Sequence, residues 1–206
     1  METNLNEELP DLLLKLENPA DQDPVLDWGA VFGNNRPVEI EIGIGKGRYI
    51  IAAAGTQPET NFVGIEWAAK YLRLALERGQ KRRLGNLRLV HADAREFVEF
   101  FVPGSSVQAF HIYFPDPWPK KRHHKRRLFN AAFLGEVARA LALRGRLWLA
   151  TDHGDYFAAM QEVLAGDRRF RGVHADWGEV KTNYEDKYLR AGKPIHRQVV
   201  ELAEKD

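Results

Sequence analysis

The feature that most limits the fold of this chain is a regular alternation, from Val38 onward, of short strand-like runs with segments of helical pattern. The runs predict five strands, at 38–42, 61–67, 87–91, 107–114 and 146–152. The segments between and after them predict helices, at 46–54, 68–83, 94–101, 128–141 and up to about 164. Strands joined by helices pair in parallel, with right-handed crossovers, and need helices on both faces. The pattern therefore predicts a doubly wound α/β sheet.

The end of the chain follows a different pattern. Residues 169–176 and 195–203 are strand-like, and no helical pattern separates them. The polar segment between them contains Gly178 and Gly192, which favours a hairpin with a long loop, and loops of this length are usually functional. Added to the parallel strands, the hairpin predicts a mostly parallel, seven-stranded sheet with an antiparallel C-terminal hairpin.

The first 37 residues lack this regularity. One helix is expected around residues 9–16, and turns are expected at 18–19, 23–24 and 33–35, where Pro, Gly and Asn cluster. A length of 206 residues suits one domain. We therefore expect an irregular or helical N-terminal extension over 1–37 and a single domain over 38–206.

A glycine-rich loop, Glu-Ile-Gly-Ile-Gly-Lys-Gly at 41–47, follows the first predicted strand. Gly43 and Gly45 allow a tight turn and a close approach of a ligand to the backbone, although glycines at such a turn can also serve packing alone. The spacing differs from the G-x-G-x-x-G of dinucleotide sites, and the carboxylate of Glu41 would repel a pyrophosphate. The loop instead suits a ligand with an amine or a sulfonium group.

Two more acids lie at the ends of predicted strands. Glu66 closes the second strand, where an acid can bind both hydroxyls of a ribose, and Asp93 follows the third, where it can accept from an adenine amino group. Either acid could instead cap a helix. Three acids at successive strand ends favour a ligand, an adenosine with a cationic tail and no phosphate. S-adenosylmethionine fits this description.

The exit of the fourth predicted strand is rigid and strongly basic. Residues 118–127 hold six of the 30 Lys and Arg residues and no acid, leaving 24 basic residues against all 29 acidic ones elsewhere. Such a run repels itself, which favours an anionic partner over a solvated face. Three prolines between 115 and 119 restrict the backbone around Asp116, whose alternative role is an Asx turn. Trp118 fits either a core position or a stacking surface.

Six stretches, in this order and spacing, resemble the bacterial tRNA (guanine-N7-)-methyltransferases: EIGIGKG, GIEWA, HADA, FPDPWPKKRHHKRR, ATDH and TNYE. The resemblance runs from about Asp27 to the C-terminus, and the basic stretch is its most specific part. It implies a Rossmann-like class I methyltransferase fold, with S-adenosylmethionine as methyl donor and S-adenosylhomocysteine as product. The implied substrate is the variable-loop guanine of tRNA, at position 46 in tRNA numbering, which becomes 7-methylguanosine.

The same motif match implies the roles of individual residues. The cofactor would be held by Glu41, Gly43, Gly45, Glu66, Asp93 and Asp116, and Asp116 would also be catalytic. The substrate would meet Lys120, Asp152, Thr182, Asn183, Tyr184 and Glu185. The RNA would contact Arg122, His123, His124, Lys125, Arg126 and Arg127.

The chemistry implied by this resemblance needs no general base, because guanine N7 carries a free lone pair. What remains is alignment and electrostatics, and a carboxylate that accepts from the guanine N1–H and amino group would supply both. The sequence leaves open whether Asp116 or Asp152 does so. Glu185 has an alternative role, an ion pair with Lys187 or Arg190 on the surface.

Three other functions are weighed against this one. A methyltransferase acting on another RNA base is disfavoured because Trp118 follows Pro117, whereas amino-directed relatives carry Pro-Pro and an aromatic residue. An oxidoreductase on the same fold is disfavoured by the glycine spacing. A non-catalytic RNA-binding module has no need of three acids facing a cofactor.

Composition limits the remaining properties. The chain has no cysteine, no apolar run long enough to cross a bilayer and no basic segment typical of a secretory signal, so we expect a cytoplasmic protein. Seven scattered histidines give no ligand cluster, and we expect no metal. The resembling family contains monomers and homodimers, and the sequence leaves this choice open.

Overall fold

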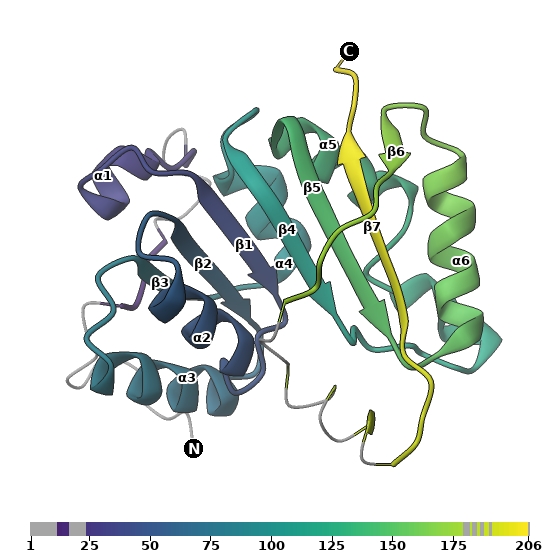
Figure 1. The fold of residues 1–206 in the computed structure, drawn as a ribbon, viewed down its shortest axis with the longest axis horizontal. Coiled ribbons are helices and arrows are strands. Elements are labelled where there is room, and N and C mark those ends of the chain that lie inside the picture. Colours follow the sequence, from purple (N-terminus) through teal and green to yellow (C-terminus); the bar gives the residue numbers. More distant parts are fainter. Residues whose placement is uncertain are drawn as a thin grey trace.

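The computed structural model describes residues 12–16, 24–178, 182, 185, 188–189 and 191–205. It confirms the predicted sheet, whose seven strands lie in the order β3-β2-β1-β4-β5-β7-β6 (Figure 1). The strands are β1 Val38–Ile42, β2 Asn61–Glu66, β3 Leu87–His91, β4 Val107–Tyr113, β5 Leu141–Thr151, β6 Phe170–Gly172 and β7 His196–Leu202. β1 to β5 pair in parallel, and β7 runs antiparallel to both β5 and β6. The antiparallel C-terminal hairpin is thus confirmed.

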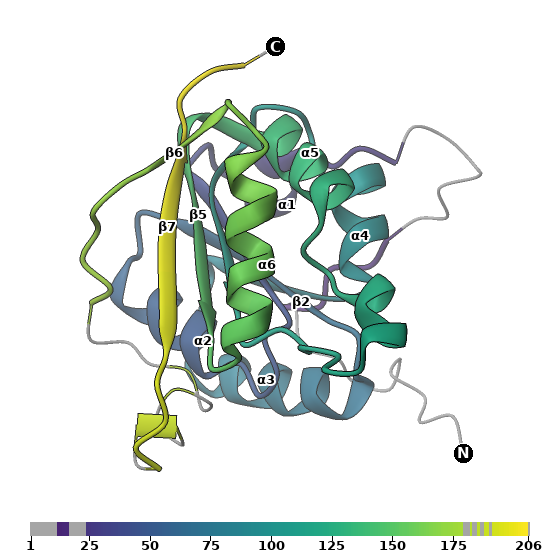
Figure 2. The same cartoon turned by 90° about the vertical axis from the view of Figure 1, so that its right-hand side faces the viewer.

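Helices cover both faces of the sheet. They are α1 Trp28–Phe32, α2 Arg48–Thr56, α3 Ala69–Lys81, α4 Ala94–Glu96, the π-helix η1 Phe97–Phe101, the 3₁₀ helix η2 Lys121–Arg126, α5 Ala131–Ala140 and α6 Gly154–Ala165. α2 and α3 lie in front of the sheet in Figure 1, while α4 and α5 lie behind it. Figure 2 shows α6 running beside β5 and β7. Each face has its own apolar core, one packed under α2 and α3 and one under α1, η1, α5 and α6.

The central strands are largely buried on both faces, as a parallel sheet covered by helices requires. All six residues of β2 are buried, and β1 is buried except at Glu39. The carboxyl ends of the parallel strands therefore meet at one edge, which the arrowheads of β1, β4 and β5 reach at the bottom of Figure 1. α3 lies along this edge. Open parallel sheets bind their ligands at such an edge.

The expected helix around residues 9–16 is wrong over 12–16, and residues 9–11 lie outside the described part. Leu13 forms a parallel bridge to Leu89, the Leu14 N–H donates to the Leu89 carbonyl at 2.8 Å, and the Leu89 N–H donates to the Leu12 carbonyl at 2.7 Å. The physical reason is the exposed edge of β3, whose backbone groups need partners. Leu12 is buried and joins the core under α3.

The helix α1, five residues long, was not predicted, and it lies within the expected irregular or helical extension. Asp27 caps its first turn by accepting from the Gly29 N–H at 2.8 Å, and Gly33, at φ 69°, ends it. Trp28 and Phe32 bury their rings in the core on the far side of the sheet from α2. This part of the first 37 residues thus contributes to the core of the sheet.

Candidate active site

A cavity of about 490 Å³ opens at the carboxyl edge of β1 to β4. Its wall includes five of the six residues predicted to hold a cofactor: Gly43, Gly45, Glu66, Asp93 and Asp116. Apolar side chains also line the cavity, including Ile65 of β2 and Leu128, which lies between η2 and α5. The size and the mixed lining are those of a small-molecule site.

The glycine loop forms one wall with bare backbone. Gly43 and Gly45 have φ angles of 73° and 52°, and a Cβ built on either would meet no atom of the described residues within 4 Å. Because both glycines line the cavity, a side chain at either position would project into it. Gly47 differs, since its Cβ would lie 2.8 Å from the Ala75 Cβ, so this third glycine serves the packing of α2 on α3. Only the first two glycines form an open cradle.

The Glu66 carboxylate accepts hydrogen bonds from two separate parts of the cavity wall. One carboxylate oxygen accepts from the Gly45 N–H at 2.7 Å, and the other accepts from the Ala68 N–H at 2.8 Å. The residue is 9% exposed, and it lines the cavity. Its carboxylate is therefore held in place by backbone donors on both sides.

Glu41 is not part of the cavity wall but lies beside a smaller space that adjoins the cavity. It lines a smaller adjoining space of about 30 Å³ together with Tyr113 and Thr182, and it accepts from the Ile50 N–H at 3.1 Å. Burial, with a smaller contribution from the charge of Glu66, raises the pKa of Glu41 to about 8. A neutral carboxyl at neutral pH would ionise if a cation were placed beside it.

This pKa predicts a pH-dependent cost to stability. Between about pH 4.5, where the unfolded carboxyl titrates, and pH 8, the folded state binds more protons, so stability falls as pH rises. Glu41→Gln removes the titration and keeps an oxygen for Ile50. Denaturant unfolding at pH 5 and pH 8 measures the free energy of unfolding of both proteins. The difference between the variant and the wild type should shift in favour of the variant at the higher pH, by at most about 1.4 kcal/mol per pH unit. A stability difference that is the same at both pH values would contradict the burial of an ionisable carboxyl here.

Asp93 forms the helix cap that the sequence allowed and also lies in the cavity wall. It caps α4, because one carboxylate oxygen accepts from the Arg95 N–H at 2.8 Å, and it lines the cavity. The side chain is half-buried. The cap fixes the carboxylate at the end of β3, and its second oxygen makes no hydrogen bond within the described residues.

Asp116 sits on a strained turn. Phe114 and Trp118, two residues before and after it, have φ angles of 53° and 43°, which non-glycine residues rarely adopt. The Phe114 N–H donates to the Ala150 carbonyl at 2.7 Å, so the turn starts from a fixed strand end. Asp116 itself is exposed at the cavity wall.

The expectation that Arg127 contacts RNA is not supported by its position. It is 7% exposed, its Nε donates to the Pro117 carbonyl at 2.9 Å, and its guanidinium lies 4.7 Å from the ring centre of Tyr156. A phosphate cannot reach a side chain enclosed in this way. Arg127 instead holds the Asp116 turn from inside the protein, which its place in a basic run does not reveal.

The rest of the basic segment lies at the surface. Most of η2 and the residue before it are exposed: Lys120, Lys121, Arg122, Lys125 and Arg126. His123 and His124 are half-buried. Trp118 packs on this segment, with the Arg126 guanidinium 4.9 Å from its ring and His123 in an edge contact at 5.8 Å. Trp118 is therefore a support for the basic segment that also lines the cavity.

The other residues predicted to meet the substrate lie in different surroundings. Asp152 follows β5 and is half-buried, and it is not among the residues that line the cavity in the described part of the chain. Asn183 and Tyr184 lie outside the described residues. Thr182 and Glu185 exchange hydrogen bonds, from the Glu185 N–H to the Thr182 hydroxyl at 3.0 Å and from the Thr182 N–H to the Glu185 carboxylate at 3.4 Å. This is the arrangement of a capping box.

Glu185 has a cationic partner on β7. Its carboxylate pairs with Arg197, whose guanidinium also lies 5.4 Å from the ring centre of Trp177. Lys187 and Arg190, the partners that the sequence offered as alternatives, lie outside the described residues, and the pairing with Arg197 was not predicted. Thr182 and Glu185 are each 9% exposed, and Thr182 lines the smaller space together with Glu41 and the glycine loop.

A buried polar network under the cavity was not predicted. His111 on β4 bonds Glu39 on β1 through Nε2 at 2.9 Å, and its Nδ1 lies 2.8 Å from the Tyr113 hydroxyl and 3.2 Å from that of Tyr49. Burial raises the pKa of Tyr113 well above its usual range. Side chains alternate between the two faces of a strand, so Glu41 of β1 lies on the same face as these groups. This alternation is the signal in the sequence from which the polar network could have been predicted.

Among the described residues, no group of three or more His, Asp or Glu side chains is arranged to hold a metal ion. None of the helices in this part of the chain has both the length and the apolar composition to cross a lipid bilayer.

Comparison with known proteins adds the family. Residues 35–198 match the family model described as "Putative methyltransferase". A tRNA (guanine-N(7)-)-methyltransferase of Rubrobacter xylanophilus is 37% identical over 189 residues, which is 89% of this chain and 84% of that protein. The protein of the same name from Listeria monocytogenes is 40% identical over 198 residues, which is 93% of this chain and 90% of that protein.

Solved structures agree on the fold. TrmN of Thermus thermophilus superimposes with a TM-score of 0.60 at 22% identity, covering 84% of this chain and 46% of that one. The antibiotic-resistance methyltransferase Kmr does so with a TM-score of 0.60 at 16% identity, covering 92% and 95%. These likenesses show a Rossmann-like class I methyltransferase fold. With the family model and the curated relatives, they show that the chain belongs to the tRNA (guanine-N(7)-)-methyltransferase family.

Proposed function

We propose that this protein transfers a methyl group from S-adenosylmethionine to N7 of the variable-loop guanine of tRNA, at position 46, and forms 7-methylguanosine. The observation that carries the proposal is the cavity itself, where an open glycine cradle, three acids and the exposed cations of η2 meet at one sheet edge. Family membership supplies the reaction class and the substrate class. We place this activity in the cytoplasm.

The residues present fit the cofactor. Gly43 and Gly45 leave open space where a side chain would block a ligand, and Glu66 and Asp93 offer fixed acceptors for ribose hydroxyls and an adenine amino group. Glu41, below the loop, would ionise beside the cationic end of the ligand. When bound, the cofactor supplies an electrophilic methyl group on a sulfonium.

The protein's own task is to place and polarise the guanine. Correct alignment alone can supply about 7–11 kcal/mol of the barrier. Asp116 lines the cavity with an exposed carboxylate, whereas Asp152 lies outside the lining, which supports Asp116 as the group that accepts from the guanine N1–H and amino donors. Its negative charge would also favour the positive charge that grows on the guanine ring.

The polar loop would complete the substrate side. We assign contacts with the base to Thr182, Asn183 and Tyr184, and a positioning role to Glu185, because its carboxylate is already used by Thr182 and Arg197. Lys120 and the exposed cations of η2 would bind the phosphates around the target nucleotide.

The cofactor assignment predicts the effect of removing one acid. Glu66→Ala should weaken S-adenosylmethionine binding about tenfold to a hundredfold, because ribose hydroxyls lose a charged acceptor that contributes about 1.5–3 kcal/mol. Titration calorimetry measures this affinity directly. Glu77→Ala, an exposed acid on the adjoining helix, is the matched control and should bind as the wild type does. Equal affinities for all three proteins would reject the role of Glu66.

The function is tested with tRNA transcripts that carry guanosine or adenosine at position 46. After reaction with S-adenosylmethionine, digestion and mass spectrometry should find 7-methylguanosine from the first transcript alone. A different methylated nucleoside would indicate a methyltransferase for another RNA base. Binding of NAD in preference to S-adenosylmethionine would indicate an oxidoreductase.

A further inference from the structure

The outer face of α3 and its end form a second basic surface. We call it the α3 surface, and its cations are Lys70, Arg73, Arg78, Lys81, Arg82 and Arg83. All six are exposed, and Glu77 is the only acid among residues 69–83. The cations thus outnumber the acids six to one on a single helix and the turn that follows it.

These cations lack the ion pairs that arginines make elsewhere in the molecule. Arg139 pairs with Glu136 at 2.7 Å, and Arg171 pairs with Glu201 at 2.7 Å. Within the described residues, none of the six side chains on the α3 surface pairs with a carboxylate, and the Arg78 guanidinium donates only to the Lys46 carbonyl. Like charges at these spacings repel, so the cluster costs stability in the absence of a partner.

The helix dipole accounts for part of this distribution only. Arg78 and Lys81 lie in the last turn, where cations are favourable. Lys70 lies in the first turn, where a cation is unfavourable, and Arg73 follows one turn later. The position of these two residues therefore requires another explanation.

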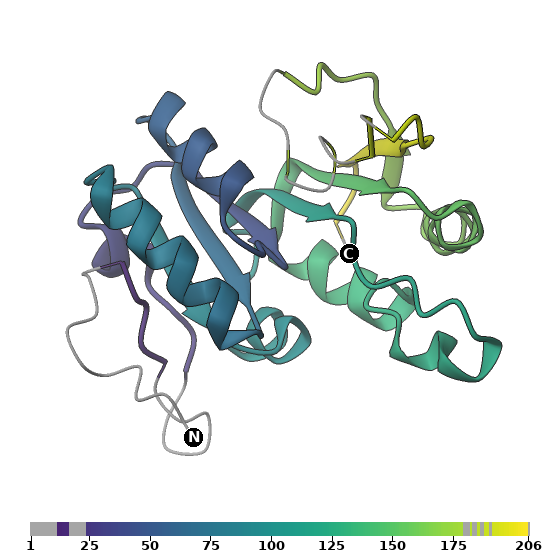
Figure 3. The same ribbon diagram turned by 90° about the horizontal axis from the view of Figure 1, so that it is seen from below.

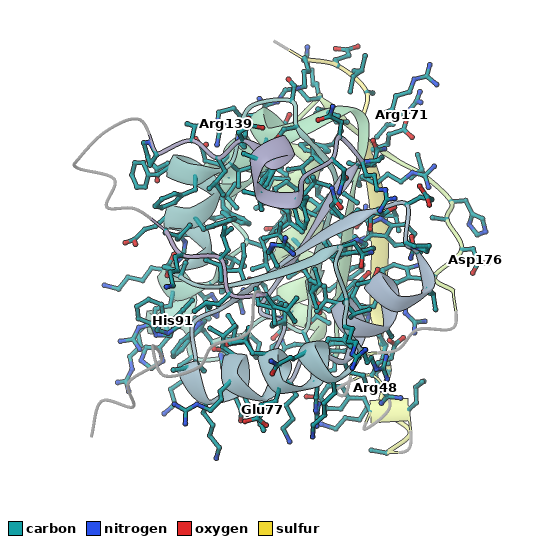
Figure 4. The ribbon with its side chains drawn as sticks, turned by 90° about the vertical axis from the view of Figure 1, so that its left-hand side faces the viewer. Arg48, Glu77, His91, Arg139, Arg171 and Asp176 are labelled. Carbon is teal, nitrogen blue, oxygen red and sulfur yellow. The ribbon has the colours of Figure 1, made fainter. Side chains whose placement is uncertain are left out.

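The α3 surface borders the cavity. Trp67, Ala68 and Tyr71, at the start of α3, line one side of it, while Trp118 and Arg126 line another. Figure 3 shows the carboxyl edge of the sheet from below, with α3 and η2 on opposite sides of this edge. In Figure 4, Glu77 of α3 and Arg48 lie along the lower edge, whereas Arg139 and Arg171 lie at the opposite edge. Two basic surfaces thus flank one site.

We propose that the α3 surface binds phosphates of the same tRNA whose guanine enters the cavity, an inference that rests on the proposed function. From Lys70 to Lys81 the helix rises about 16 Å, so several phosphates of one strand can lie along it. Exposed cations that pair with no carboxylate of the described residues suit backbone contacts, which orient a nucleic acid without reading its sequence. η2 then holds the target nucleotide, and the α3 surface holds a more distant part of the tRNA.

The test compares two triple variants that remove equal charge. One is Lys70→Gln, Arg73→Gln and Lys81→Gln on the α3 surface. The other is Arg144→Gln, Arg146→Gln and Arg168→Gln, exposed arginines at the amino-terminal half of β5 and beyond the end of α6. Equilibrium binding of tRNA is measured from low to high salt, and thermal unfolding checks that both variants fold.

Each lost phosphate contact reduces the slope of log affinity against log salt by about 0.7–0.9. The α3 variant should therefore reduce the slope by about two units and raise the KM for tRNA while keeping kcat, and the control should match the wild type. Equal slopes for the two variants would overturn the proposal. Failure of the proposed function would show differently, as wild-type protein that binds tRNA and transfers no methyl group to it. Wild-type protein that binds no tRNA would overturn both.

Discussion

Asp116→Ala is expected to lower kcat for tRNA methylation by about a hundredfold to a thousandfold, the usual effect of losing one group that stabilises developing charge. Asp116 lines the cavity on a turn whose backbone is fixed by the Arg127 contact to the Pro117 carbonyl. Without its carboxylate, the guanine loses an acceptor that sets its orientation and an anion that opposes the new positive charge. Single-turnover methylation with saturating cofactor measures this loss.

Asp152→Ala is the matched control, because Asp152 follows the neighbouring strand yet lies outside the cavity lining. It should affect the rate far less than Asp116→Ala, and both proteins should retain their melting temperatures. The opposite order, with Asp152→Ala inactive and Asp116→Ala active, would transfer the orienting role to Asp152.

The sheet and the positions of the glycine loop and the acids at its edge were predictable because their signals are local. β1 and β3 have the predicted bounds, and Glu66 and Asp93 were placed correctly because parallel strands bring their carboxyl ends to one edge. The glycine loop was predictable for the same reason, since its spacing and its position after a strand are both read from a few residues. The sequence could not predict which glycines face the cavity, because Gly47 differs from the other two only in the helix packed against it.

The errors and omissions came from contacts between distant parts of the chain. Leu13 lies in a run that favours a helix, yet the edge of β3 draws it into a bridge. Arg127 lies in a run of exposed cations, yet the ring of Tyr156 and the Pro117 carbonyl enclose it. Glu185 finds its partner on the last strand. In each case the deciding neighbour is absent from the local sequence.

N7 of the guanine is the atom proposed to accept the methyl group, and a tRNA that lacks this atom is the sharpest test. A tRNA with 7-deazaguanosine at position 46 has C–H in place of N7, so it keeps the base-pairing edge and lacks the attacking lone pair. This tRNA should bind with the affinity of the unmodified one and accept no methyl group at position 46. Methyl transfer to the analogue at the rate of the unmodified tRNA would contradict the proposed role of N7.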